Sequence, residues 1–179
     1  MNWQRQWERG TGWATFVETA MANAVLWREL TERARVPDTA VERVEALGRR
    51  VRLLVLGADW CGDAVNTLPV VARLTERASN LELRHLDRDE FPEVMDAHLT
   101  NGARSIPVVI ALDEAGQELG WWGPRPTELQ RWFVTEGKQL PPDERYRRLR
   151  GWYARDRGGS TVEEIVAMLE STGSRRATA

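Results

Sequence analysis

Apolar residues follow two different patterns in the middle of the chain. Residues 51–56 (VRLLVL) are almost continuously apolar, which is typical of a strand buried within a sheet. Over residues 63–77 the apolar positions recur every three or four residues, which predicts an amphipathic helix. Pro69 lies inside that helix and is expected to kink it. The two patterns meet at a short polar, glycine-containing segment, so we expect a strand–turn–helix unit there.

The same kind of pattern predicts the rest of the central region. Further strands are expected over 81–86, 107–112 and 117–122, and further helices over 91–99 and 128–136. A hairpin turn with glycine at its end, residues 113–116, separates the last two strands.

Helices are also predicted on both sides of this region. Apolar residues at helical spacing predict one helix over 13–34 and a second over 38–48. Near the C-terminus a charged helix is expected over 143–156 and a last helix from Thr161, with 171–179 as a loose tail.

Composition narrows the class of protein. The 179 residues suffice for one domain with a sizeable core. A net charge of −2 with both signs interspersed does not favour a nucleic-acid partner. Residues 1–9 are too polar for a signal peptide, and the uncharged run 19–27 is too short to cross a membrane. Together with the single cysteine in the chain, these features predict a cytoplasmic protein that binds neither nucleic acid nor membrane.

That cysteine, Cys61, falls at the turn between the buried strand and the helix. Unpaired N–H groups and the positive end of the helix dipole stabilise a thiolate there. The carboxylates of Asp59 and Asp63 act in the opposite direction. The alternative is an inert, buried thiol, but the position at a helix start favours a reactive one.

Residues 58–64 (ADWCGDA) resemble the active-site loop W-C-G-x-C of the thioredoxin superfamily. Ala64 stands where that family has its second, resolving cysteine, and Val55 stands where thioredoxins carry a buried acid. The spacing from Cys61 to Pro69 matches the family, and residues 101–112 resemble its second signature, in which the Ile106–Pro107 bond would be cis beside the cysteine.

The resemblance implies an α/β class protein with a thioredoxin fold, a central mixed β-sheet flanked by helices. The whole chain, 1–179, would form one domain, with an N-terminal helical extension over 1–50, a thioredoxin-like core over 51–137, and C-terminal helices and a tail over 138–179. This layout is similar to a group of bacterial thioredoxin-family proteins without a well-defined substrate.

The resemblance also implies a function. Cys61 would be the nucleophile of a thiol–disulfide oxidoreductase that forms mixed disulfides. Since Ala64 removes the resolving thiol, the mechanism would be monothiol: the substrate is a protein disulfide or mixed disulfide, and a small thiol reductant releases it. The expected substrate groove is lined by the residues around both signatures, namely Trp60, Gly62, Asp63, Ala64, Ser105, Ile106 and Pro107.

Three alternatives stay open at this stage. The fold could serve as a redox-inactive module that binds a peptide or protein, or Cys61 could be a thiol-stress sensor that is reversibly oxidised. A third hypothesis is that Ala64 replaces a cysteine by engineering, which would make the loop an ordinary dithiol site.

Other residues are assigned structural roles. His85 and His98 lack the spacing of metal ligands, so we expect no metal and no cofactor. Trp121 and Trp122 must point to opposite faces of a strand, so one should be exposed. The arginine-rich run 145–150 is interpreted as a solvated helix face rather than a phosphate site.

Overall fold

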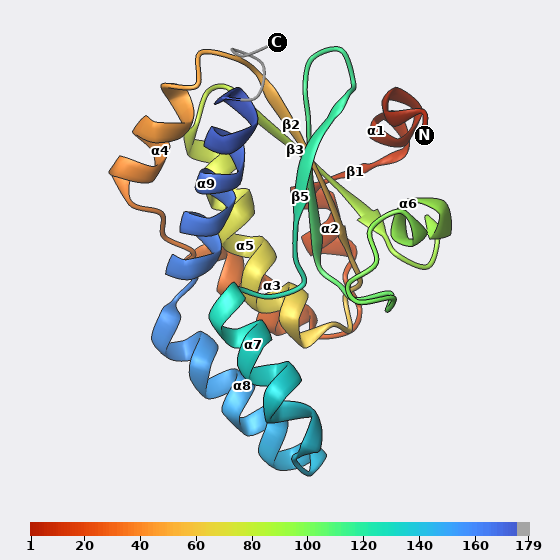
Figure 1. Cartoon of the computed structure of the whole chain (residues 1–179), viewed down its shortest axis with the longest axis vertical. Helices are drawn as coiled ribbons and strands as arrows, with labels where there is room; N and C mark the ends of the chain where they lie inside the picture. The colour runs from red at the N-terminus through yellow and green to blue at the C-terminus, as the bar shows by residue number, and fades with distance from the viewer. Residues whose placement is uncertain (175–179) are drawn as a thin grey trace.

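A five-stranded mixed β-sheet with the strand order β1-β3-β2-β4-β5 runs through the molecule (Figure 1). The computed structural model describes residues 1–174. The strands are β1 (Thr11–Gly12), β2 (Val51–Gly57), β3 (Leu81–Asp87), β4 (Val108–Leu112) and β5 (Glu118–Trp122). β2 pairs in parallel with β3 and antiparallel with β4, and both edge strands are antiparallel to their neighbours. The predicted α/β class with a central mixed sheet is confirmed.

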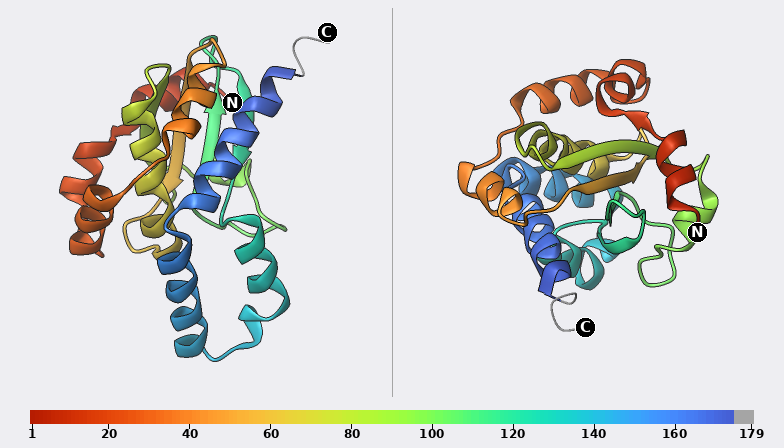
Figure 2. Two further views of the ribbon diagram at one scale, coloured as in Figure 1. Left: turned by 90° about the vertical axis from the view of Figure 1, so that its left-hand side faces the viewer. Right: turned by 90° about the horizontal axis from the view of Figure 1, so that it is seen from above.

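Helices cover both faces of the sheet. They are α1 (Trp3–Arg9), α2 (Trp13–Thr19), α3 (Ala24–Arg33), α4 (Asp38–Glu45), α5 (Gly62–Arg77), α6 (Pro92–Asp96), α7 (Thr127–Thr135), α8 (Pro142–Asp156) and α9 (Gly159–Ser174), with a short 3-10 helix over Gly137–Gln139. α4, α5 and α9 lie on one side of the sheet, and α1 and α6 on the other (Figures 1 and 2).

The core lies where β2 and β4 cross the centre of the sheet. Leu53, Leu54, Val55 and Leu56 are fully buried, as the continuous apolar run predicted. Among the residues described, no helix is both long and apolar enough to cross a bilayer.

The predicted single helix over 13–34 is wrong. The chain forms α2 and α3 instead, separated at residues 20–23, where Asn23 has a positive φ of 55°. The N–H groups of Met21 and Ala22 donate to one carboxylate oxygen of Asp59, at 2.9 and 2.8 Å, rather than to carbonyls of a continuing helix. The Asp59 carboxylate, from the loop before Cys61, therefore takes the place of the helix carbonyls as acceptor for these two N–H groups. A pattern of neighbouring residues cannot reveal such a distant acceptor.

Removing this carboxylate should loosen the N-terminal segment from the cysteine loop. We expect Asp59→Ala to lower the free energy of unfolding by about 2 kcal/mol, because two N–H groups lose a charged acceptor. Chemical denaturation measures the loss. Glu18→Ala, in the same N-terminal region, has no such contact and serves as the control; an equal loss in both variants would contradict the role given to Asp59.

Near both ends of residues 1–174 the chain forms regular elements that the sequence pattern did not predict. Residues 3–9 form α1, and β1 adds an edge strand that the pattern did not predict. α9 begins at Gly159 and extends to Ser174, so the loose tail predicted from residue 171 is wrong for residues 171–174. The Thr172 hydroxyl is buried and accepts a hydrogen bond of 2.6 Å from Arg49. The rest of the predicted tail, 175–179, lies outside the described residues.

Candidate functional site

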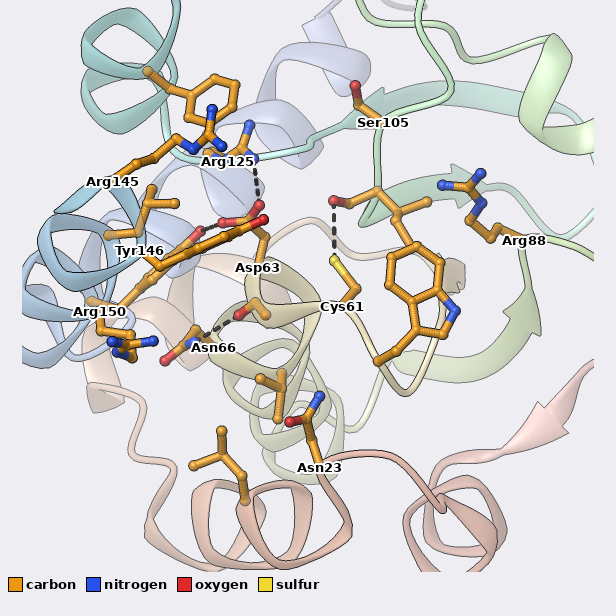
Figure 3. A pocket seen from close by; sticks show the side chains of 18 of the residues that line it. Asn23, Cys61, Asp63, Asn66, Arg88, Ser105, Arg125, Arg145, Tyr146 and Arg150 are labelled. Carbon is orange, nitrogen blue, oxygen red and sulfur yellow. Dashed lines mark hydrogen bonds and ion pairs between the residues drawn. The ribbon is translucent and has the colours of Figure 1, made fainter. Parts of the chain in front are cut away.

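Cys61 is the N-cap residue of α5, immediately after the loop that follows β2. Its Sγ lies 3.6 Å from the carbonyl oxygen of Ile106, to which the thiol donates (Figure 3). It also lies 3.5 Å from the backbone nitrogen of Ala64, which donates to the sulfur. The Ile106–Pro107 peptide bond is cis. The two predicted signatures therefore meet at the sulfur, because β2 and β4 are neighbours in the sheet.

The electrostatic surroundings of this thiol differ from those of a simple helix start. Burial raises the pKa of the Cys61 thiol above its ordinary value, and the negative charge of Asp63 raises it further. The N–H groups of Ala64 and Asp63 and the charge of Arg125 act in the opposite direction but do not reverse the shift. The pKa decrease that a helix N-terminus alone would cause is thus outweighed, and Cys61 is mainly a neutral thiol at pH 7.

Asp63 is held in a buried network that the sequence did not indicate. One carboxylate oxygen accepts a 2.5 Å hydrogen bond from the guanidinium of Arg125, and the other accepts a 2.8 Å bond from the Tyr153 hydroxyl. The side chains of Asp63 and Arg125 are 13% and 12% exposed, so their ion pair is largely shielded from water. Burial raises the pKa of Tyr153, and the Asp63 carboxylate adds to this, so the phenol stays a donor.

A cavity of about 670 Å³ opens beside the sulfur (Figure 3). Six of the eight predicted site residues line it, namely Trp60, Cys61, Gly62, Asp63, Ser105 and Ile106. The other two, Ala64 and Pro107, do not, and the Ala64 side chain is fully buried in the core. Trp60 is 53% exposed and forms a wall next to the cysteine, with the guanidinium carbon of Arg88 lying 5.4 Å from the centre of its ring.

The opposite wall comes from α8, and sequence reasoning missed it. Arg145, Tyr146, Leu149, Arg150 and Tyr153 all line the cavity. They recur at helical spacing, which was a visible signal that they share one face. The interpretation of the run 145–150 as a solvated helix face agrees with the exposure of Tyr146 and Arg150, but it did not foresee that this face also lines the cavity. Nothing local to the run indicated that α8 folds back beside residue 61.

The two histidines lie apart from this chemistry. His85 stacks on Phe16 at 3.8 Å between ring centres, and burial lowers its pKa to about 3, so it is neutral. His98 is buried beside α6, where its ring nitrogens contact the Val94 carbonyl and Glu118 at 2.7 and 3.1 Å. Within residues 1–174, no group of three or more metal-ligating side chains is placed to hold a metal ion.

Comparison with known proteins agrees with the fold described above. A family model described as thioredoxin matches residues 10–141, most of the chain. The chain belongs to the thioredoxin family. The match begins before the predicted core, so this thioredoxin-family domain includes β1, which pairs with β3 at the edge of the sheet. No curated protein matches the chain.

Two solved structures share the fold of this thioredoxin-family protein. A protein of unknown function from Pseudomonas aeruginosa is 24% identical with a TM-score of 0.71, and the match covers 90% of this chain and 93% of that one. An HIV epitope-scaffold is 21% identical with a TM-score of 0.74, and the match covers 96% of this chain and 99% of that one. At these identities the similarity concerns the fold.

Proposed function

We propose that this thioredoxin-family protein exchanges thiols and disulfides by a monothiol mechanism, with Cys61 forming mixed disulfides. The observation that carries the proposal is the position of the sulfur. It lies at the N-cap of α5, borders a cavity large enough for a small molecule, and is 3.6 Å from the backbone of Ile106. Protein disulfides or mixed disulfides are the proposed substrates.

In the first step the Cys61 thiol loses its proton to solvent and the thiolate attacks one sulfur of the substrate disulfide. The substrate S–S bond breaks, a bond forms between Cys61 Sγ and one substrate sulfur, and the other sulfur leaves as a thiolate that takes up a proton. Cys61 is oxidised and the leaving half of the substrate is reduced. The N–H of Ala64 points at the sulfur and stabilises its negative charge.

Release requires a thiol from outside the chain. Cys61 is the only cysteine in the sequence and the buried side chain at position 64 is a methyl group, so no internal thiol can attack the mixed disulfide. A small thiol attacks the substrate sulfur, forms a new disulfide with it and returns Cys61 as a thiolate. A reducing cytoplasm would supply that thiol.

A second candidate is a redox-inactive module that holds a partner in the same cavity. The raised pKa of Cys61 favours it, because only a small fraction of the thiol is ionised at pH 7. Reactivity across pH separates the two candidates.

The test is the rate of adduct formation with the neutral 2-hydroxyethyl disulfide between pH 6 and 10, followed by intact mass. We expect one adduct, absent in Cys61→Ser, whose rate still increases above about pH 9 because the raised pKa delays ionisation. Addition of 2-mercaptoethanol should return the free protein. Adduct formation about 100-fold slower than with a free thiol at pH 9.5 would favour the binding module.

A further inference from the structure

The cavity beside Cys61 has two chemically different walls (Figure 3). Trp60, Cys61 and Ile106 form the wall where exchange takes place, and α8 supplies Arg145 and Arg150 on the other. The volume of about 670 Å³ is within the range of sites for small molecules. A bound molecule can therefore contact the sulfur and α8 at the same time.

The charges that line this cavity do not balance. Five arginines line it, namely Arg88, Arg104, Arg125, Arg145 and Arg150, against the single carboxylate of Asp63. Asp63 pairs with Arg125, while Asp89 and Asp96 pair with Arg88 and Arg104 at 3.1 and 2.6 Å. Asp59, the other carboxylate of the cysteine loop, is bonded to the N–H groups of residues 21 and 22.

Two positive charges are left over, and both are on α8. Within residues 1–174 neither Arg145 nor Arg150 forms an ion pair, whereas Arg148 on the same helix pairs with Glu144 at 2.6 Å. The chain as a whole carries a net charge of −2, so this excess is local. Guanidinium groups bind carboxylates through two parallel hydrogen bonds and retain their charge at any pH at which the protein is folded.

We propose that the cavity binds a low-molecular-weight disulfide, or the thiol derived from it, that carries at least two negative charges. Its sulfur lies against Cys61, and its anionic groups lie against Arg145 and Arg150. This assignment rests on the proposed function and names the substrate class of the same site. In the exchange step, the Cys61 thiolate breaks the ligand's S–S bond and forms a mixed disulfide, and the anionic thiolate released takes up a proton from solvent.

A charge series tests the substrate class. Second-order rate constants at pH 8.5 are measured for 3,3′-dithiodipropionate, 2-hydroxyethyl disulfide and cystamine, each divided by its rate constant with 2-mercaptoethanol to remove intrinsic reactivity. We expect the dianionic reagent to be favoured over the neutral one by at least about tenfold at low salt, with cystamine the slowest. The preference should fall towards one in 1 M salt.

Variants of α8 locate the effect. In the double variant Arg145→Gln/Arg150→Gln, the normalised rate constants for the dianionic and the neutral disulfide should differ by no more than about twofold. The matched control is Arg147→Gln/Arg155→Gln, which removes the same charge from the same helix at positions that border a separate groove. The control should retain the preference. Equal losses in the two double variants would overturn the assignment, because net charge alone would then explain it.

Binding without reaction keeps this inference separate from the proposed function. Cys61→Ser is titrated by calorimetry with 3,3′-thiodipropionate, a dicarboxylate thioether that cannot exchange. We expect binding that is lost when Arg145 and Arg150 are also replaced by glutamine. Failure of every disulfide to react would contradict the monothiol function even if the thioether binds. If the neutral disulfide reacts, but the dianionic disulfide is not preferred and the thioether does not bind, only the present inference is overturned. The same holds if the preference for anions is found only with acidic peptide disulfides.

Discussion

Replacing Ala64 with cysteine should change the product of disulfide treatment from a mixed disulfide at Cys61 to an internal disulfide between Cys61 and the new thiol at position 64. The backbone nitrogen of residue 64 already lies 3.5 Å from Cys61 Sγ, so a thiol one helical turn into α5 starts close to the sulfur. An intramolecular thiol has an effective concentration in the millimolar range or above, far higher than micromolar protein.

The side chain at position 64 is fully buried, so a sulfur atom added there must pack against its neighbours. A Cβ built at Gly57 would lie 3.8 Å from Ala64 Cβ but only 3.1 Å from Leu68 and 3.2 Å from His85, so little volume is free on that side; cysteine, however, adds only one heavy atom. We therefore expect the variant to fold, with a loss in the free energy of unfolding of about 1 kcal/mol from tighter packing.

Intact mass after treatment with oxidised glutathione measures the outcome. In the unmodified chain, with Ala64, most of the protein should retain one glutathionyl group until a thiol is added. In Ala64→Cys the retained adduct should fall below about one tenth, with the loss of two hydrogens instead. Ala64→Ser is the control of equal size, and it should retain the adduct. A stable glutathione adduct in folded Ala64→Cys would show that the geometry at position 64 does not support resolution.

Replacing Asp63 with asparagine should make Cys61 react faster at neutral pH. The carboxylate raises the pKa of the thiol, and its removal also leaves the charge of Arg125 uncompensated beside the sulfur. Both changes lower the pKa of Cys61. Each unit by which that pKa falls increases the thiolate fraction about tenfold at pH 7 and costs about threefold in nucleophilicity.

The net expectation is a three- to tenfold faster reaction with 2-hydroxyethyl disulfide at about pH 7. This advantage should shrink and then reverse as the pH rises far enough to ionise both thiols, because the thiolate of lower pKa is the weaker nucleophile. Stopped-flow or mass measurements across pH provide the rates. Breaking the buried pair should also lower the free energy of unfolding by about 3 kcal/mol, so a thermal melt must show that the variant is folded.

Tyr153→Phe separates charge from packing. It removes the hydroxyl that donates to Asp63 but leaves the carboxylate in place, so the pKa of Cys61 should stay raised. If the rate at pH 7 in folded Asp63→Asn is equal to or lower than the rate in the unmodified chain, Asp63 does not control the thiol.

Local patterns determined most of the central fold and the place of the reactive group. The continuous apolar run of β2, the helical period of α5 and the glycine-containing turn between them are properties of neighbouring residues, and they put Cys61 at a helix start in the sequence and in the structure alike. The family resemblance also rests on short segments, and the match to residues 10–141 confirms it.

The environment of the sulfur was decided only by tertiary structure. Asp63 bonds to Arg125 and Tyr153, which lie 62 and 90 positions away in the sequence. Burial of Cys61 and the carboxylate that these contacts hold beside it raise the pKa of a thiol that its helix position alone would acidify, and the opposing charge of Arg125 does not reverse the shift. The break at residues 20–23 has the same origin, because Asp59 supplies an acceptor from 37 and 38 positions away. Periodicity shows which face of a helix is apolar, but charge and burial at a site depend on which distant segments fold against it.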